Sequence, residues 1–145
     1  MDIHTDLQTQ KELLEKAAAM LQQSYAPYSH FHVGAALLAK DGSVYTGCNI
    51  ENASYGACNC AERTAFFKAV SEGENTFRAI AIAGGKDGVM GDFCPPCGIC
   101  RQVMREFCDP ESFEIILGND KGQIRVFRLR DLLPESFGPD HLAEE

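Results

Sequence analysis

Two short cysteine-containing blocks place the strongest constraint on how this chain can fold. Residues 60–63 read Cys-Ala-Glu-Arg, and residues 96–102 read Pro-Cys-Gly-Ile-Cys-Arg-Gln. Cys97 and Cys100 are three residues apart, so a helix would place both thiols on one face. Three thiolates with a fourth position left open are typical of a catalytic zinc, whereas structural zinc sites use four protein ligands. The fold must therefore bring two distant segments together at one metal ion.

Glu62 adds a group that can move protons beside this metal. It stands two residues after Cys60, and residues two apart on a helix do not share a face, so it does not compete for the metal. Zinc lowers the pKa of bound water, and a neighbouring carboxylate can serve as general base and then as general acid. His or Cys, one residue, Glu, and later Pro-Cys-x-x-Cys is the signature of zinc deaminases. We expect Cys60, Cys97 and Cys100 to bind one Zn²⁺ and Glu62 to be catalytic.

Other segments resemble the short-chain, homotetrameric, zinc-dependent cytidine deaminases. Residues 31–36 (Phe-His-Val-Gly-Ala-Ala) are similar to the Phe-Pro-Val-Gly-Ala-Ala stretch of that family. Residues 47–53 (Gly-Cys-Asn-Ile-Glu-Asn-Ala) and 61–65 (Ala-Glu-Arg-Thr-Ala) match the family at the expected spacing. His32 stands where the family usually has Pro, which removes a fixed φ angle without changing the chemistry.

This resemblance implies hydrolysis of cytidine or deoxycytidine to the uridine product and ammonia, in pyrimidine salvage. It also implies substrate-binding roles for Phe31, Asn49, Glu51 and Ala61. Phe31 would contact the pyrimidine, and Asn49 and Glu51 would hydrogen-bond the ribose hydroxyls.

The same resemblance implies a homotetramer in which the active site is shared between subunits. Ala53, Tyr55 and Phe137 would reach the substrate bound by a neighbouring chain. Phe137 is a large apolar residue in a polar Pro-Glu-Ser-Phe-Gly-Pro setting. Exposed aromatic residues of this kind often mark an interface, although Phe137 could instead cover the core of its own subunit.

Arg63 is expected to compensate charge around the metal. Zn²⁺ and three thiolates sum to one negative charge, which opposes ionisation of a bound water. Helix N-termini at the sulfurs would supply partial positive charge. Arg63 could also donate hydrogen bonds to a zinc-bound thiolate, the supporting role that outer-shell residues play at metal sites.

The chain holds seven cysteines, and other uses of them are open. A structural zinc site could take Cys58 or Cys94 as its fourth ligand. Cys94, Cys97 and Cys100 also mimic an iron–sulfur run, but the fourth Cys followed by Pro is missing. Beyond the three expected ligands we expect ordinary thiols at Cys48, Cys58, Cys94 and Cys108.

Two alternative functions share these motifs. One is a deaminase of a modified cytosine nucleoside, such as the blasticidin type, against which the residues at 49 and 51 argue. The other is a non-catalytic zinc module for protein binding.

The apolar pattern predicts one domain over residues 1–145, with loose ends at about 1–6 and 138–145. The resemblance implies that this domain is cytidine-deaminase-like. Only residues 118–122 separate the last two strands, too few for the crossover that parallel strands need, so these strands should be antiparallel. We expect an α/β fold with three α-β-α layers around a five-stranded mixed sheet. The expected helices cover residues 7–23, 60–73, 97–107 and 129–133, and the strands cover 31–38, 44–46, 79–83, 113–117 and 124–127.

Net charge narrows the range of partners. The chain has 13 Lys and Arg against 21 Asp and Glu, a formal net charge of -8. This disfavours a nucleic acid polymer, whose binding rests on basic residues that neutralise phosphates. The sequence shows no apolar run of membrane-spanning length and no charged-then-apolar leader. We therefore expect a cytoplasmic protein that acts on a small-molecule nucleoside.

Overall fold

The computed structural model describes residues 3–143. No helix in this part of the chain is long and apolar enough to span a bilayer. The elements follow in the order α1 Leu7–Ala19, β1 Phe31–Ala39, β2 Val44–Cys48, α2 Ala61–Ser71, β3 Phe77–Lys86, α3 Gly98–Phe107, β4 Glu114–Gly118, β5 Ile124–Arg128 and α4 Leu129–Leu132, with short 3-10 helices over 20–22, 55–57 and 139–141.

The five strands form one mixed sheet in the order β2-β1-β3-β4-β5. β3 and β4 are parallel and are connected through α3, while every other neighbouring pair is antiparallel. The last pair is antiparallel because a tight turn, with Gly122 at φ 74°, reverses the chain between β4 and β5. Glycine adopts such a positive φ without steric cost. The predicted mixed sheet and the direction of its last two strands are confirmed.

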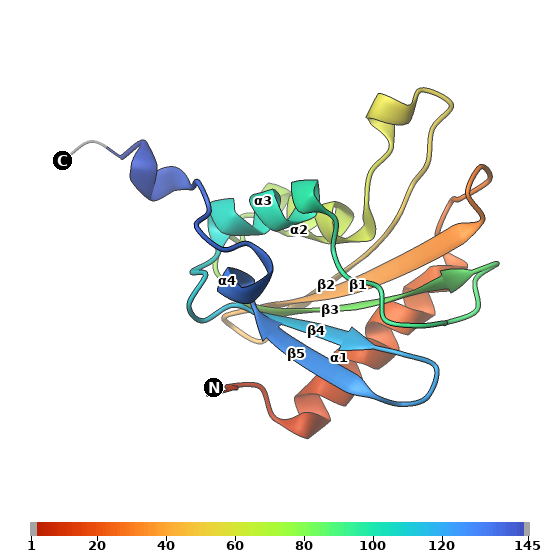
Figure 1. Cartoon of the computed structure of the whole chain (residues 1–145), viewed down its shortest axis with the longest axis horizontal. Helices are drawn as coiled ribbons and strands as arrows, with labels where there is room; N and C mark the ends of the chain where they lie inside the picture. Colours follow the sequence, from red (N-terminus) through yellow and green to blue (C-terminus); the bar gives the residue numbers. More distant parts are fainter. Residues whose placement is uncertain (1–2, 144–145) are drawn as a thin grey trace.

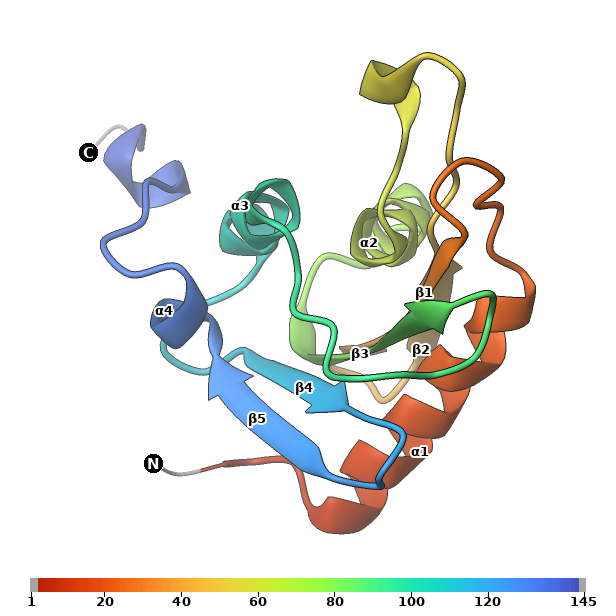
Figure 2. The same cartoon turned by 45° about the vertical axis from the view of Figure 1, so that its right-hand side comes forward.

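Helices cover both faces of the sheet (Figure 1). α1 lies on one face, and α2 and α3 lie on the other, as the turned view also shows (Figure 2). Successive side chains of a strand point to opposite faces. Leu37 and Ile80 belong to the core cluster that contains Phe66 of α2, whereas Ala36 belongs to the cluster that contains Leu13 of α1. The predicted three-layer α-β-α arrangement is confirmed.

β3 is longer than expected, running from Phe77 to Lys86 instead of 79–83. β1 spans nine residues and pairs with β3 along its whole length, from Phe31 opposite Lys86 to Ala39 opposite Phe77. Because β1 is long enough to pair with them, Gly84 and Gly85 belong to β3, although glycine usually indicates a loop.

A carboxylate anchors the N-terminal segment, so the expected loose end over residues 1–6 is wrong at Thr5. Glu114 is fully buried in β4, and Thr5 is only 4% exposed. The Glu114 carboxylate accepts hydrogen bonds from the backbone N–H groups of His4 (2.6 Å) and Thr5 (3.2 Å) and from the Thr5 hydroxyl (2.5 Å). A buried carboxylate needs such partners. Residues 1–2 and 144–145 of the two expected loose ends lie outside the described residues.

Gly47 allows α2 to lie close against β2. A Cβ atom built on Gly47 would stand 2.4 Å from the carbonyl oxygen of Ala61 and 2.6 Å from the backbone nitrogen of Ala65. Both are backbone atoms of α2, so they cannot move aside as a flexible side chain would. This contact therefore fixes the height of α2 above the sheet, and with it the positions of Cys60 and Glu62.

We expect Gly47→Ala to destabilise the protein and to weaken zinc binding. The added methyl group overpacks a backbone contact, which costs about 2 kcal/mol, or roughly 4–8 °C in Tm. Differential scanning calorimetry and the zinc content per chain measure the two effects. Gly98→Ala is the matched control, because a Cβ at Gly98 meets nothing within 4 Å. Equal Tm values for the two variants would contradict the role assigned to Gly47.

Candidate active site and metal centre

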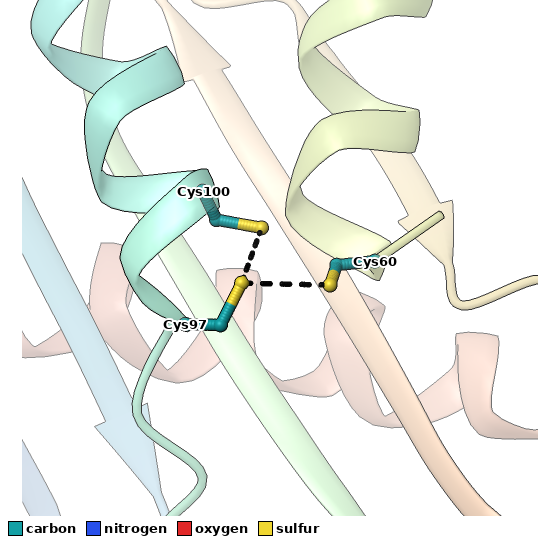
Figure 3. A group of neighbouring side chains, drawn as sticks. All are labelled: Cys60, Cys97 and Cys100. Carbon is teal, nitrogen blue, oxygen red and sulfur yellow. Dashed lines mark hydrogen bonds between the residues drawn. The ribbon is translucent and has the colours of Figure 1, made fainter. Parts of the chain in front are cut away.

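Three cysteine sulfurs meet where the N-termini of α2 and α3 face each other. Cys60 is the N-cap residue of α2, Cys97 is the N-cap residue of α3, and Cys100 lies in the first turn of α3. Their side chains point toward one another from the two helices (Figure 3). The Sγ of Cys97 lies 3.7 Å from the Sγ of Cys60 and 3.5 Å from that of Cys100.

This spacing fits a tetrahedral zinc ion. Zn–S bonds of ~2.3 Å place the sulfurs of a tetrahedral site roughly 3.8 Å apart, close to the observed distances. All three sulfurs lie within 4.8 Å of one another, and no further His, Cys, Asp or Glu from residues 3–143 joins them. Neither Cys58 nor Cys94 is therefore a fourth ligand, as a closed structural site would need. Three ligands leave one position open.

The cluster concentrates negative charge, and nearby groups offset it. Hydrogen bonding with Cys100 lowers the pKa of the Cys60 thiol to about 5, while the same interaction and burial raise the pKa of Cys100. Arg63 donates from Nη2 to the Sγ of Cys60 at 3.2 Å. Both helix N-termini add partial positive charge. The structure thus contains the guanidinium–sulfur contact predicted for Arg63.

Glu62 is a buried carboxyl group beside these sulfurs, with only 4% of its surface exposed. Burial raises the pKa of Glu62 to about 7, and negative charge on Cys60 adds to the rise. A carboxyl group in this range can both take up and release a proton near neutral pH. A strongly shifted pKa is common among catalytic groups that lie in clefts.

A cleft of about 280 Å³ opens over this centre. Its size suits one small molecule better than a polymer. It is lined by seven residues that the sequence singled out: Asn49, Glu51, Cys60, Ala61, Glu62, Arg63 and Cys97.

Comparison with known proteins agrees with this geometry. Residues 7–114 match the family model for the cytidine and deoxycytidylate deaminase zinc-binding region. The chain belongs to this family. A cytidine deaminase of Halalkalibacterium halodurans is 51% identical over 91% of this chain and 96% of its own length, and one of Sporosarcina psychrophila is 47% identical over 92% and 94%. A crystal structure of cytidine deaminase from Burkholderia pseudomallei superposes with a TM-score of 0.79 at 50% identity, covering 88% of this chain and 98% of that one.

These relatives confirm the family, the enzyme class and the zinc dependence predicted from the sequence. The roles of individual site residues rest on the geometry of this chain. Asn49 and Glu51, the two residues expected on the ribose, are already engaged within it.

The Asn49 amide ties three segments together at the rim of the cleft. Its Oδ1 accepts from the Val33 backbone N–H (2.9 Å) and from the Ser24 hydroxyl, and its Nδ2 donates to the Phe31 carbonyl (2.8 Å). One N–H of Nδ2 is left for a ligand, since an amide nitrogen carries two.

The Glu51 carboxylate is held by the loop before β1. It accepts from the backbone N–H groups of Tyr28 (2.9 Å) and Ser29 (3.1 Å) and from the Ser29 hydroxyl (2.5 Å). The Ser29 hydroxyl is the chief reason that the pKa of Glu51 lies below its ordinary value. An ionised carboxylate has lone pairs to spare for further donors, so Glu51 can still accept a substrate hydroxyl.

Five predicted site residues do not line the cleft of their own chain, and one of these, Cys100, is a buried sulfur of the metal cluster. Phe31 begins β1 and is 42% exposed. Ala53 and Tyr55 lie in the loop that projects from the molecule around the 3-10 helix over 55–57 (Figures 1 and 2), and Tyr55 is 76% exposed. Phe137 is 57% exposed, and its carbonyl contacts Gln102 of α3.

Sequence reasoning gave no place in the substrate cleft to several residues that line it. Cys94 and Pro95 directly precede the second motif, and Asn59 directly precedes the first, so adjacency was an available signal. Ser29 had none, because its role depends on a contact with a residue 22 positions away. The additional residues that line the cleft are Val33, Cys58, Asn59, Cys94 and Pro95.

Zinc binding and proton transfer should separate in two variants. We expect Glu62→Gln to keep one zinc per chain while turnover falls by roughly 10²–10⁴-fold, the contribution of a general acid–base. Cys97→Ser should lose zinc and thermal stability together, because the metal links two helices. Metal analysis after dialysis and calorimetry provide the readouts. Cys58→Ser is the control for zinc content, and zinc retention by Cys97→Ser would refute the assigned ligand set.

Proposed function

We propose that this chain catalyses the hydrolytic deamination of free cytidine and deoxycytidine, giving the uridine product and ammonia. The observation that carries this proposal is a buried carboxyl group, Glu62, beside three sulfurs that leave a fourth metal position open. Zinc bound by Cys60, Cys97 and Cys100 would supply a Lewis acid that activates water at the ring C4 position.

Glu62 would move the protons in this reaction. As a base it takes a proton from the attacking water and delivers it to ring N3. It then takes the second water proton from the hydroxyl formed on C4 and, as an acid, gives it to the departing amine, which leaves as ammonia. Its pKa of about 7, raised by burial, supports both steps. One carboxylate suffices because it returns to its starting state in each cycle.

A free nucleoside fits this chain better than a polynucleotide. The net charge of -8 opposes binding of a phosphate backbone. Glu51 lines the cleft of about 280 Å³, and its ionised carboxylate would repel a phosphate bound beside it. Glu51 and the remaining N–H of Asn49 would bind the ribose hydroxyls. The reaction would serve pyrimidine salvage, as the family resemblance implies, and we expect it to take place in the cytoplasm.

The exposed aromatic residues support a homotetramer. Tyr25, Tyr28, Phe31 and Tyr55 are all more than 40% exposed. Tyr28 and Tyr55 join the two loops that carry them through a ring contact of 6.3 Å. Aromatic residues are enriched at protein interfaces. In a closed symmetric assembly, Ala53, Tyr55 and Phe137 would reach the cleft of a neighbour.

Substrate choice is tested by a spectrophotometric assay. We expect loss of the cytosine absorbance with cytidine and with deoxycytidine, and at least ~10-fold lower kcat/KM with deoxycytidylate because of repulsion by Glu51. Blasticidin S provides the modified-nucleoside comparison. Glu51→Gln is the matched variant, and it should reduce the difference in kcat/KM between deoxycytidine and deoxycytidylate. No turnover of either free nucleoside by the zinc-loaded protein would refute the proposed function.

Shared active sites are tested with two defective chains, which are dissociated, mixed and allowed to reassociate. Glu62→Gln lacks the proton shuttle, and Phe137→Ala lacks the residue expected to reach a neighbour. Random equimolar mixing leaves about a quarter of the sites with an intact Glu62 and an intact neighbouring Phe137. We expect activity above the sum of the two separate proteins. A monomer by analytical ultracentrifugation, or purely additive activity, would show that each chain builds its own site.

A further inference from the structure

Polar contacts, rather than buried apolar side chains, hold residues 134–143, the segment that follows α4 and Leu133. Phe137 and Leu142 leave 57% and 74% of their surfaces exposed. In both overall views this segment runs from α4 past α3 (Figures 1 and 2). Its conformation must therefore be set by specific hydrogen bonds and ion pairs with the rest of the molecule.

Arg105 of α3 makes most of these contacts. Its Nε donates to the Ser136 hydroxyl at 2.9 Å, and its Nη2 donates to the Asp140 carboxylate at 2.6 Å. One turn earlier, Gln102 donates from Nε2 to the Phe137 carbonyl at 2.9 Å. The two partners of the guanidinium lie on either side of Phe137 in the sequence, so Arg105 fixes the segment at both ends.

Gly138 lets the guanidinium approach the backbone of this segment. A Cβ atom at Gly138 would stand 2.3 Å from both Cζ and Nη1 of Arg105. Gly138 is itself buried. The group is thus enclosed by residues 136–140, rather than paired with a single acidic side chain.

The environment of the Arg105 guanidinium differs from that of an ordinary surface ion pair. Exposed pairs contribute little, because water screens them and two side chains must be ordered. The Arg105 side chain is only 12% exposed. Its planar fork can hold two acceptors in a fixed geometry. Hydrogen bonding from Arg105 lowers the pKa of Asp140, which keeps that carboxyl group ionised.

We propose that Arg105 is a positioning residue for the active site of the neighbouring subunit. By fixing residues 136–140, it presents the ring of Phe137 outward in one orientation, stacked on His141 with 5.1 Å between ring centroids. The inference rests on the proposed function, in which Phe137 contacts the substrate of a neighbour. A ring that is already ordered pays less conformational entropy when that contact forms.

Arg105→Ala should therefore weaken substrate binding and leave the chemical step intact. We expect KM for cytidine to rise roughly two- to tenfold, the range that one aromatic contact covers, with kcat within about twofold of wild type. Asp140→Asn releases the same segment without emptying the space of the guanidinium and should shift KM in the same direction. Arg130→Ala is the matched control, since Arg130 makes a 2.7 Å ion pair with Glu111 and no hydrogen bond to residues 136–140.

The action of Arg105 across subunits is tested by mixing Arg105→Ala chains with Glu62→Gln chains. Hybrid sites combine Glu62 from the first chain with a correctly held Phe137 from the second, so a population of sites with wild-type KM should return. In a Phe137→Ala protein, Arg105→Ala should cause no further rise in KM. The effects of two residues are not additive when one acts through the other.

Two results would overturn this inference. One is a wild-type KM in both Arg105→Ala and Asp140→Asn. The other is a raised KM that Glu62→Gln chains do not restore, which would place the action of Arg105 within its own subunit. Failure of the proposed function is distinguished from both, because the wild-type protein would then be inactive toward cytidine.

Discussion

Two helix N-termini converge on one point, and their positive ends offset the negative charge that three cysteine sulfurs bring there. The first turn of a helix has backbone N–H groups without intrahelical partners, and its dipole favours negative charge. Cys60 and Cys97 occupy the N-cap positions, and neither side chain is used to cap its own helix. The sulfurs thus remain available to a metal ion in a setting that stabilises thiolates.

Sheet topology brings the other parts of the site to the same place. β1 and β2 are antiparallel, so Asn49, after the end of β2, lies near the start of β1 at Phe31. β3 is antiparallel to β1, so its carboxyl end reaches the same edge and leads through residues 87–96 to Cys97. Ligands of open α/β sheets commonly bind outside the carboxyl ends of strands. Here the close contact at Gly47 sets α2 against this edge.

Local sequence signals predicted most of the architecture and the metal centre. The spacing of Cys97 and Cys100 and the position of Glu62 depend only on helix geometry, so they could be read from the sequence. The 118–122 turn is also a local signal, because it is too short for a crossover between parallel strands and so predicts that the last two strands are antiparallel. Thr5 and Glu114 could not be paired in this way, because 109 residues separate them and only the folded sheet brings them together.

The 49–59 loop carries both the residues expected to bind the ribose and two residues expected to contact a neighbouring subunit. It carries Asn49, Glu51, Ala53 and Tyr55, yet none of its eleven residues, all of them described by the structure, belongs to either core cluster. Asn49 and Glu51 are still tied to the chain before β2 by hydrogen bonds. Ala53 and Tyr55 are exposed, so substitutions at these two positions remove little buried surface from a single chain. The exposed tip of this loop can therefore change in sequence without loss of the core, while the starts of α2 and α3 remain constrained by packing.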